Sequence, residues 1–337
     1  MDLETFFTRL YVLVDDWYKA EGWMLMQRHR GPALQLSDSE VLTIAIAGQW
    51  RAGVPWTSER SLVRYLLVHG RHWFPHMLER SAFNARVKQL WRALVCLQQR
   101  LADWMETGRS AYEVVDCLPL PACSVAQAAT GKSHWLWWSQ WGRGGNEGGW
   151  VFGEQLLMAV TQQGAITGWL LGPAQTDDRW LMQAFVSARA GHMQLVAPDK
   201  RPQNGHARSL HPPAGQVLPL LAVGQPTGEP YLADRGFNGA RWQLHWLTFG
   251  ARVITVPPAN APDAWSQPDS AWLSRHRQII ETTFAFLKDV FAIKHLQAHS
   301  RWGQLTRIAA KCAAFNFGLW LNHLLERPSH AFATLIL

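Results

Sequence analysis

The spacing of apolar residues divides the chain into a helical first part and a mixed second part. Apolar residues recur three and four apart from Phe6 to Tyr18 and again from Ser81 to Glu106, which predicts amphipathic helices. Ser37 and Glu40 have the spacing of a capping box just before another apolar run, which predicts that a helix begins there. We therefore expect an all-helical N-terminal domain over residues 1–110. The basic side of the long helix predicted from Ser81 to Glu106 is open to two interpretations, a solvated face or a face that also meets DNA or a second subunit.

From Ala111 onward, short β-rich runs alternate with turns and helical stretches. The candidate strands are Tyr112–Cys117, Val151–Thr161, Ala165–Leu171, Glu229–Ala233 and Arg252–Val256. A helix that begins near Thr176 separates the third strand from the fourth, and a helix over Ala240–Phe249 separates the fourth from the fifth. This order predicts an α/β fold of the ribonuclease-H-like type over residues 111–330, a mixed sheet with flanking helices.

Two segments of the second part do not fit this order. Residues 134–150 combine five tryptophans with a glycine-rich tail, and residues 191–228 form a connection rich in Pro, Gly and His that is long for a loop. Both are predicted to be surface insertions. The tryptophans fit two interpretations, a hydrophobic plug over the sheet or a surface on which DNA bases stack.

Composition and charge narrow the classes of function. The chain is 48% hydrophobic and 17% charged, which is typical of a globular protein, and it lacks a signal peptide and a long apolar run, so we expect a cytoplasmic protein with no membrane partner. Its four cysteines form no CxxC pair, which argues against a structural zinc site. The net charge is +7, distributed as +3 in residues 1–110, −1 in residues 111–274 and +5 in residues 275–337. Basic ends around a neutral middle suit an enzyme that binds a polyanion.

Three acidic residues lie where an α/β sheet carries its chemistry. Asp116 and Asp234 each end an apolar β-rich run, so both side chains are expected at the carboxyl edge of buried strands. Glu281 lies beside the apolar stripe of a predicted helix over Arg275–Ala292, which lets it lean over that edge. Each residue alone has a plainer interpretation, since an aspartate after a strand often forms a turn and Glu281 could pair with Arg277 along the helix. Together they predict three converging carboxylates, whose mutual repulsion requires bound cations.

Mg²⁺ is the cation that such a site favours, because it takes one or two carboxylates and fills its octahedral shell with water and phosphate oxygens. We expect two Mg²⁺ ions, for which Mn²⁺ can substitute, bound by Asp116, Asp234 and Glu281. Cationic side chains near these carboxylates are expected to bind DNA phosphates. The DNA-binding candidates are Arg277 and Lys288, on the same side of the helix as Glu281, together with Arg235 and Lys132.

The residues around the three carboxylates resemble those of the DDE transposases of bacterial insertion sequences, most closely the insertion-sequence 982 type. Val-Val-Asp116-Cys-Leu-Pro resembles the first-aspartate motif, Ala-Asp234-Arg-Gly-Phe the second, and Arg277-x3-Glu281-x6-Lys288 the signature around the catalytic glutamate. The resemblance implies a ribonuclease-H-like catalytic domain, dependence on Mg²⁺ or Mn²⁺, and strand transfer. It also implies double-stranded DNA partners, namely terminal inverted repeats and target DNA, and a homodimer in the DNA complex.

The chain departs from that family pattern in two places. Ser274 stands where a fuller signature has Tyr, and the Trp-rich segment after Lys132 stands where a more basic stretch is expected. Both departures concern DNA handling and leave the carboxylates in place. Two alternatives to a transposase stay open, a ribonuclease-H-like nuclease or domesticated transposase that cleaves without joining, and a catalytically dead DNA-binding protein. The presence of all three acidic residues argues against the last.

Overall fold

The computed structural model describes residues 1–25, 34–105, 110–130, 138–143, 149–191, 220–222, 230–258, 260, 264–298 and 300–336. Internal contacts divide the chain into two compact units. We call them the helical unit, Met1–Met105 with Phe286–Ile293 and Leu305–Leu337, and the sheet unit, Glu106–Ala285 with Lys294–Gln304. The C-terminal segment therefore groups with the N-terminal helices, whereas the sequence analysis assigned it to the second domain.

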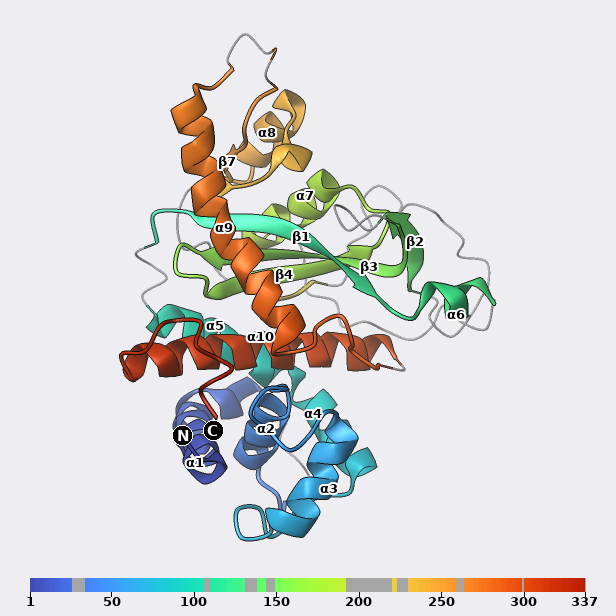
Figure 1. Cartoon of the computed structure of the whole chain (residues 1–337), viewed down its shortest axis with the longest axis vertical. Helices are drawn as coiled ribbons and strands as arrows, with labels where there is room; N and C mark the ends of the chain where they lie inside the picture. Colours follow the sequence, from blue (N-terminus) through green and yellow to red (C-terminus); the bar gives the residue numbers. More distant parts are fainter. Residues whose placement is uncertain are drawn as a thin grey trace. The chain divides into compact units, whose positions relative to one another are not determined.

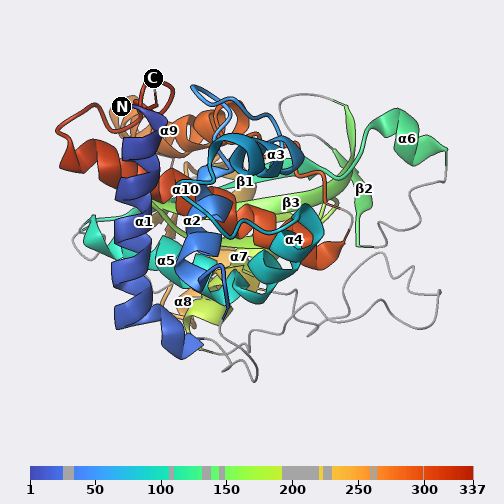
Figure 2. The ribbon, with the colours of Figure 1, turned by 90° about the horizontal axis from the view of Figure 1, so that it is seen from below.

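The helical unit is built from amphipathic helices whose apolar faces pack together. Its elements are α1 (Leu3–Ala20), η1 (Gly22–Leu25), α2 (Asp38–Ala47), α3 (Glu59–His69), α4 (Arg80–Gln89), α5 (Trp91–Trp104) and most of α10 (Arg301–Leu324). The predicted capping box is confirmed, because the backbone N–H of Ser37 donates to Glu40 Oε2 at 2.6 Å and the N–H of Glu40 donates to Ser37 Oγ at 3.2 Å. Figures 1 and 2 show α5 and α10 side by side, and the Asn316 amide of α10 donates to the Gln98 carbonyl of α5 at 2.9 Å.

The long helix predicted from Ser81 to Glu106 is two helices. Leu90, with φ −87° and ψ 11°, ends α4 and precedes α5. Its side chain is buried, so the apolar stripe continues across the break and conceals it in the sequence. Two arginines from the basic side of this segment form ion pairs within the unit, Arg86 with Asp38 and Arg100 with Glu21.

In its described residues, the sheet unit contains a mixed sheet of seven strands in the order β5-β4-β3-β1-β6-β7, with β2 paired to β3. The strands are β1 (Glu113–Pro121), β2 (Gln140–Arg143), β3 (Trp150–Thr161), β4 (Ile166–Pro173), β5 (Leu220–Ala222), β6 (Tyr231–Leu232) and β7 (Val253–Ile254). Its helices are α6 (Val125–Ala129), α7 (Asp178–Arg189), η4 (Arg235–Phe237), α8 (Ala240–Leu247) and most of α9 (Gln267–Asp289). β1 pairs antiparallel with β3 and parallel with β6, so it is the strand at which the direction of the sheet changes.

Helices cover both faces of this sheet around β1. Alternate residues of β1, Val115 and Cys117 among them, face the apolar cluster formed with α7 and α8. Tyr112 and Asp116 have the opposite parity and contact α9, Tyr112 through ring contacts to Trp272 and His276. Figure 1 shows α9 crossing β1 on that side. Successive residues of β1 therefore alternate between the face covered by α7 and α8 and the face covered by α9.

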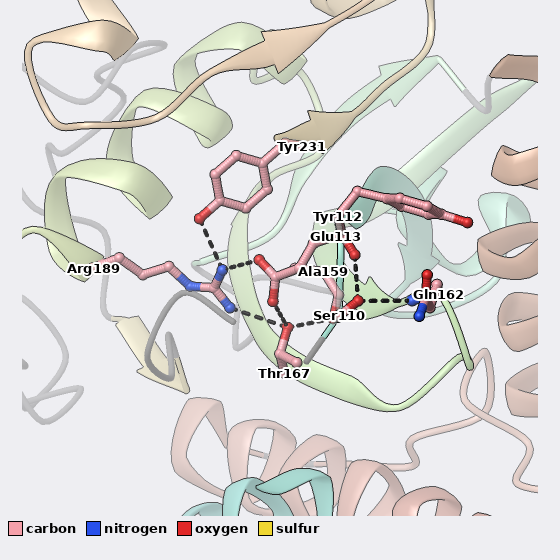
Figure 3. A network of polar contacts seen from close by, with 8 residues as sticks. All are labelled: Ser110, Tyr112, Glu113, Ala159, Gln162, Thr167, Arg189 and Tyr231. Carbon is pink, nitrogen blue, oxygen red and sulfur yellow. Dashed lines mark hydrogen bonds and ion pairs between the residues drawn. The ribbon is translucent and has the colours of Figure 1, made fainter. Parts of the chain in front are cut away.

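A buried polar network connects β1, β4, β6 and the end of α7 (Figure 3). The Arg189 guanidinium forms an ion pair with Glu113, donates to the Tyr231 hydroxyl at 2.9 Å and to Thr167 Oγ1 at 3.1 Å. Thr167 in turn donates to Glu113 at 2.5 Å. Glu113 and Arg189 are at most 2% exposed, so every charge in this network is compensated by a partner inside the protein.

The predicted fold class is confirmed, a mixed α/β structure with a helical N-terminal part. The segments predicted as surface insertions are not wholly outside the sheet, because β2 lies within residues 134–150 and β5 within residues 191–228. Most of the remaining residues of both segments fall outside the described part, so the two interpretations of the tryptophans stay predictions. No helix in the described part of the chain has the length and apolar character needed to span a bilayer.

Candidate active site

Asp116 lies on β1, and Asp234 lies two residues beyond the end of the neighbouring parallel strand β6. In the register of β1 and β6, Glu113 pairs with Tyr231 and Val114 with Leu232, and this constant difference, continued two residues past the end of β6, aligns Asp116 with Asp234. Parallel strands lie about 4.8 Å apart, and aligned residues project from the same face. Two aspartates far apart in sequence are thereby brought side by side.

The position of Asp116 in its strand differs from the prediction. β1 continues to Pro121, so Asp116 lies inside the strand and not at its end. The edge of the sheet at this point comes from β6, which stops at Leu232, two residues before Asp234. The sheet is open beside Asp116 because its partner strand β6 ends early, whereas β1 itself continues past Asp116.

The two aspartates line one pocket of about 920 Å³, which we call the acidic pocket. Its acidic lining residues are Asp116, Asp177, Asp178, Asp234 and Glu281, and its basic ones are Arg143, Arg179 and Arg277. The three carboxylates singled out from the sequence therefore do reach one pocket. Glu281 lies on its exposed side, whereas Asp116 is about 21% exposed.

The environment of Asp116 disfavours its charge. The pKa of Asp116 is raised to about 7, and burial is the largest cause; the carboxylates of Asp234 and Asp178 also raise this pKa, while the Cys117 backbone N–H and the Arg277 guanidinium lower it. The N–H of Cys117 donates to Asp116 Oδ1 at 2.8 Å, and Arg277 Nη2 lies 3.3 Å from Asp116 Oδ2. A raised pKa at a crowded carboxylate is the electrostatic mark of a site that takes up a proton or another cation.

Asp178 is a pocket carboxylate that the sequence analysis did not single out. It is the first residue of α7, follows the N-cap Asp177, and accepts a hydrogen bond from Gln155 Nε2 at 3.1 Å. Burial raises the pKa of Asp178, hydrogen bonds from the Cys117 thiol and Gln155 lower it, and Asp234 raises it. The sequence does contain a sign of an additional role for Asp178. One aspartate is enough to cap the start of a helix, and α7 begins with two in succession, Asp177 and Asp178.

Asp234 is oriented by its own turn. Its carboxylate caps η4 and accepts from the Gly236 N–H at 2.8 Å. A Cβ added at Gly236 would lie 2.9 Å from Asp234 Oδ1 and 3.3 Å from Asp178 Oδ2. Glycine at 236 therefore leaves room for the two carboxylates to approach each other.

The side chains predicted to bind DNA phosphates lie in different surroundings. Arg277 lines the acidic pocket and pairs with Asp116, and among the described residues no ion pair connects it to Glu281 along the helix. Arg235 is exposed and lines a different hollow. Lys288 is half-buried in α9 at a point assigned to the helical unit and does not line the acidic pocket. Lys132 lies outside the described residues.

The donor set fits a divalent cation through its two central aspartates. Within the described part of the chain, no three His, Cys, Asp or Glu side chains form a group that could hold one ion. Mg²⁺ needs only one or two carboxylates, with water and phosphate completing its shell. Asp116 and Asp234 are the two residues that would supply these carboxylates, and in the structure the cation beside Asp116 is the Arg277 guanidinium.

Residues 124–317, more than half of the 337 residues, match the family model described as Transposase DDE domain. The chain belongs to the transposase DDE domain family. This membership makes it an enzyme of a DNA-binding family that generally uses divalent metal ions. The match includes Asp234 and Glu281 and begins after Asp116. No curated protein and no solved structure matches the chain.

Proposed function

We propose that the chain is a DNA transposase that cleaves DNA at the ends of its element and joins those ends to target DNA. The observation that carries this proposal is the alignment of Asp116 with Asp234 across β1 and β6, in a pocket that Glu281 also lines. Membership of the transposase DDE domain family supports it. We assign Asp116, Asp234 and Glu281 as the catalytic carboxylates.

In this proposal Asp116 and Asp234 hold Mg²⁺ from within the sheet, and Glu281 contributes from α9. When bound, two such ions activate the attacking water or 3′-hydroxyl and stabilise the leaving oxygen of an in-line phosphoryl substitution. Arg277 has a separate task. Its guanidinium lines the acidic pocket beside Asp116 and would bind the phosphate next to the scissile bond. Lys288 and Lys132 are proposed to bind DNA phosphates at a greater distance.

A plasmid that carries the gene with its native flanking DNA provides the test. The purified protein is expected to cut at the element ends only with Mg²⁺ or Mn²⁺, and to join a pre-cleaved 3′-hydroxyl end to a second plasmid. Glu281→Gln should bind the end DNA with nearly unchanged affinity and cut none of it, because the amide keeps the shape of the side chain and loses its charge. Cutting without joining would assign the nuclease alternative instead, and cutting by Glu281→Gln at the normal rate would remove Glu281 from the site.

A further inference from the structure

A second hollow, which we call the arginine groove, begins at the residue after Asp234. It has a volume of about 990 Å³ and is lined by residues of η4, α8, β7 and the loop that follows, with Arg235, Arg252 and Trp265 among them. Asp234 and Arg235 are consecutive, yet Asp234 lines the acidic pocket and Arg235 lines the groove. The turn of η4 therefore separates a hollow rich in carboxylates from a hollow whose described lining residues include none.

Among the described residues, no acidic side chain compensates the charge of the arginine groove. None of the described lining residues is an aspartate or a glutamate. Arg235 and Arg252 are both exposed, and neither side chain forms a hydrogen bond or an ion pair with another described residue. The acidic pocket differs in this respect, since Arg179 pairs there with Asp177 and Arg277 with Asp116. Two arginines that have no acidic partner in the described part of the chain are suited to bind an anion from outside the protein.

The backbone and the remaining side chains of the groove suit a phosphate joined to a nucleoside. Gly239 precedes α8 with φ +152°, a conformation that favours glycine, and no side chain caps the helix there. Within the described residues, the first N–H groups of α8 therefore have no side-chain cap at the point where Asn238, Gly239 and Ala240 line the groove. Trp265 adds a half-buried aromatic wall of the kind on which a base stacks.

We propose that the arginine groove binds the phosphate backbone of the DNA strand that leads away from the Asp116–Asp234 pair, with Arg235 and Arg252 each contacting a phosphate. This inference rests on the proposed function, because it takes the scissile phosphate to lie at Asp234. Successive phosphates of one strand advance only about 3.4 Å along the duplex axis. A strand held at Asp234 thus brings its next phosphates to Arg235, the adjacent residue.

Binding of a labelled DNA duplex, without divalent metal and at several salt concentrations, tests the groove apart from catalysis. The double variant Arg235→Gln, Arg252→Gln should weaken binding and reduce the slope of log affinity against log salt by about one to two, since each lost phosphate contact removes about 0.9. The matched control is Arg241→Gln, Arg275→Gln. It removes the same charge from two exposed arginines of the sheet unit that line neither hollow, and its slope should stay close to that of the unaltered protein.

An unchanged slope in the groove variant, or an equal loss in the control, overturns the proposal. Both variants should unfold at the temperature of the unaltered protein, because the four arginines are exposed. The proposed function is judged separately, by cleavage and joining. If the protein cuts DNA and the groove variant binds as well as the control, the groove fails while the transposase assignment stands. If the protein never cuts DNA but the groove variant loses affinity, the groove stands as a nucleic-acid site without that assignment.

Discussion

The guanidinium of Arg277 lies 3.3 Å from the carboxylate of Asp116 and connects α9 to β1. Arg277 favours the charged form of Asp116, so Arg277→Met should raise the pKa of Asp116 further above its value of about 7. A titration of side-chain carboxyl carbons by NMR, in metal-free protein, measures this. The control is Arg275→Met, a change at an exposed arginine of the same helix that does not line the pocket. An unaltered titration of Asp116 in Arg277→Met would show that the ion pair is absent in solution.

The raised pKa of Asp116 makes stability depend on pH. Because the pKa of this carboxyl is higher in the folded protein than its ordinary value of 3.8, its stabilising contribution is complete below about pH 4 and is lost as the pH rises through about 7. Without metal, Asp116→Asn should therefore be more stable than the unaltered protein above pH 7, by roughly 2–4 kcal/mol. Urea unfolding of both proteins across this range measures the difference. If the difference in the free energy of unfolding between the two proteins does not grow between pH 4 and pH 7, the pKa of Asp116 is not raised in the folded protein.

Asp178 should contribute to cation binding, whereas its neighbour Asp177 should not. Asp178 interacts electrostatically with Asp234 and Asp116, while Asp177 is paired with Arg179 at 2.7 Å. Asp178→Asn should weaken Mn²⁺ binding about tenfold, the scale of a residue that supports a metal ligand. Asp177→Asn should leave Mn²⁺ affinity nearly unchanged and lower the free energy of unfolding slightly through the weakened N-cap. Calorimetric titration with Mn²⁺ compares the pair, and equal effects would count against the role of Asp178.

The network of Glu113 and Arg189 should respond differently to single and double changes. Arg189→Met leaves Glu113 buried without its cation and should lower the free energy of unfolding by about 3–5 kcal/mol. Adding Glu113→Leu removes the uncompensated charge, so the double variant should recover much of that loss. Chemical unfolding of the unaltered protein, of Arg189→Met, of Glu113→Leu and of the double variant tests this. A double variant as unstable as the sum of its single changes would mean that the two side chains do not act as a pair.

Features that depend on a few neighbouring residues could be predicted from the sequence. The capping box at Ser37 and the aspartates that follow apolar runs can each be recognised from a short stretch of residues. Features that arise from distant pairing were not predictable in this way. Leu90 interrupts a helix while its apolar stripe continues, the neighbour of Arg277 proved to be Asp116 and not Glu281, and Asp178 enters the pocket because α7 packs against the sheet. These outcomes depend on which elements meet, and residue patterns within one element do not specify that.

The alignment of Asp116 and Asp234 has a consequence for how relatives of this protein can vary. Hydrogen bonds between β1 and β6 set that alignment, and the length of chain between the two strands does not enter it. Insertions and deletions between the two aspartates can therefore accumulate without separating them, provided that Tyr231 and Leu232 keep their partners on β1. A search for relatives that fixes the number of residues between the aspartates would miss such proteins, whereas one that fixes the two short strands and leaves the spacing free would find them.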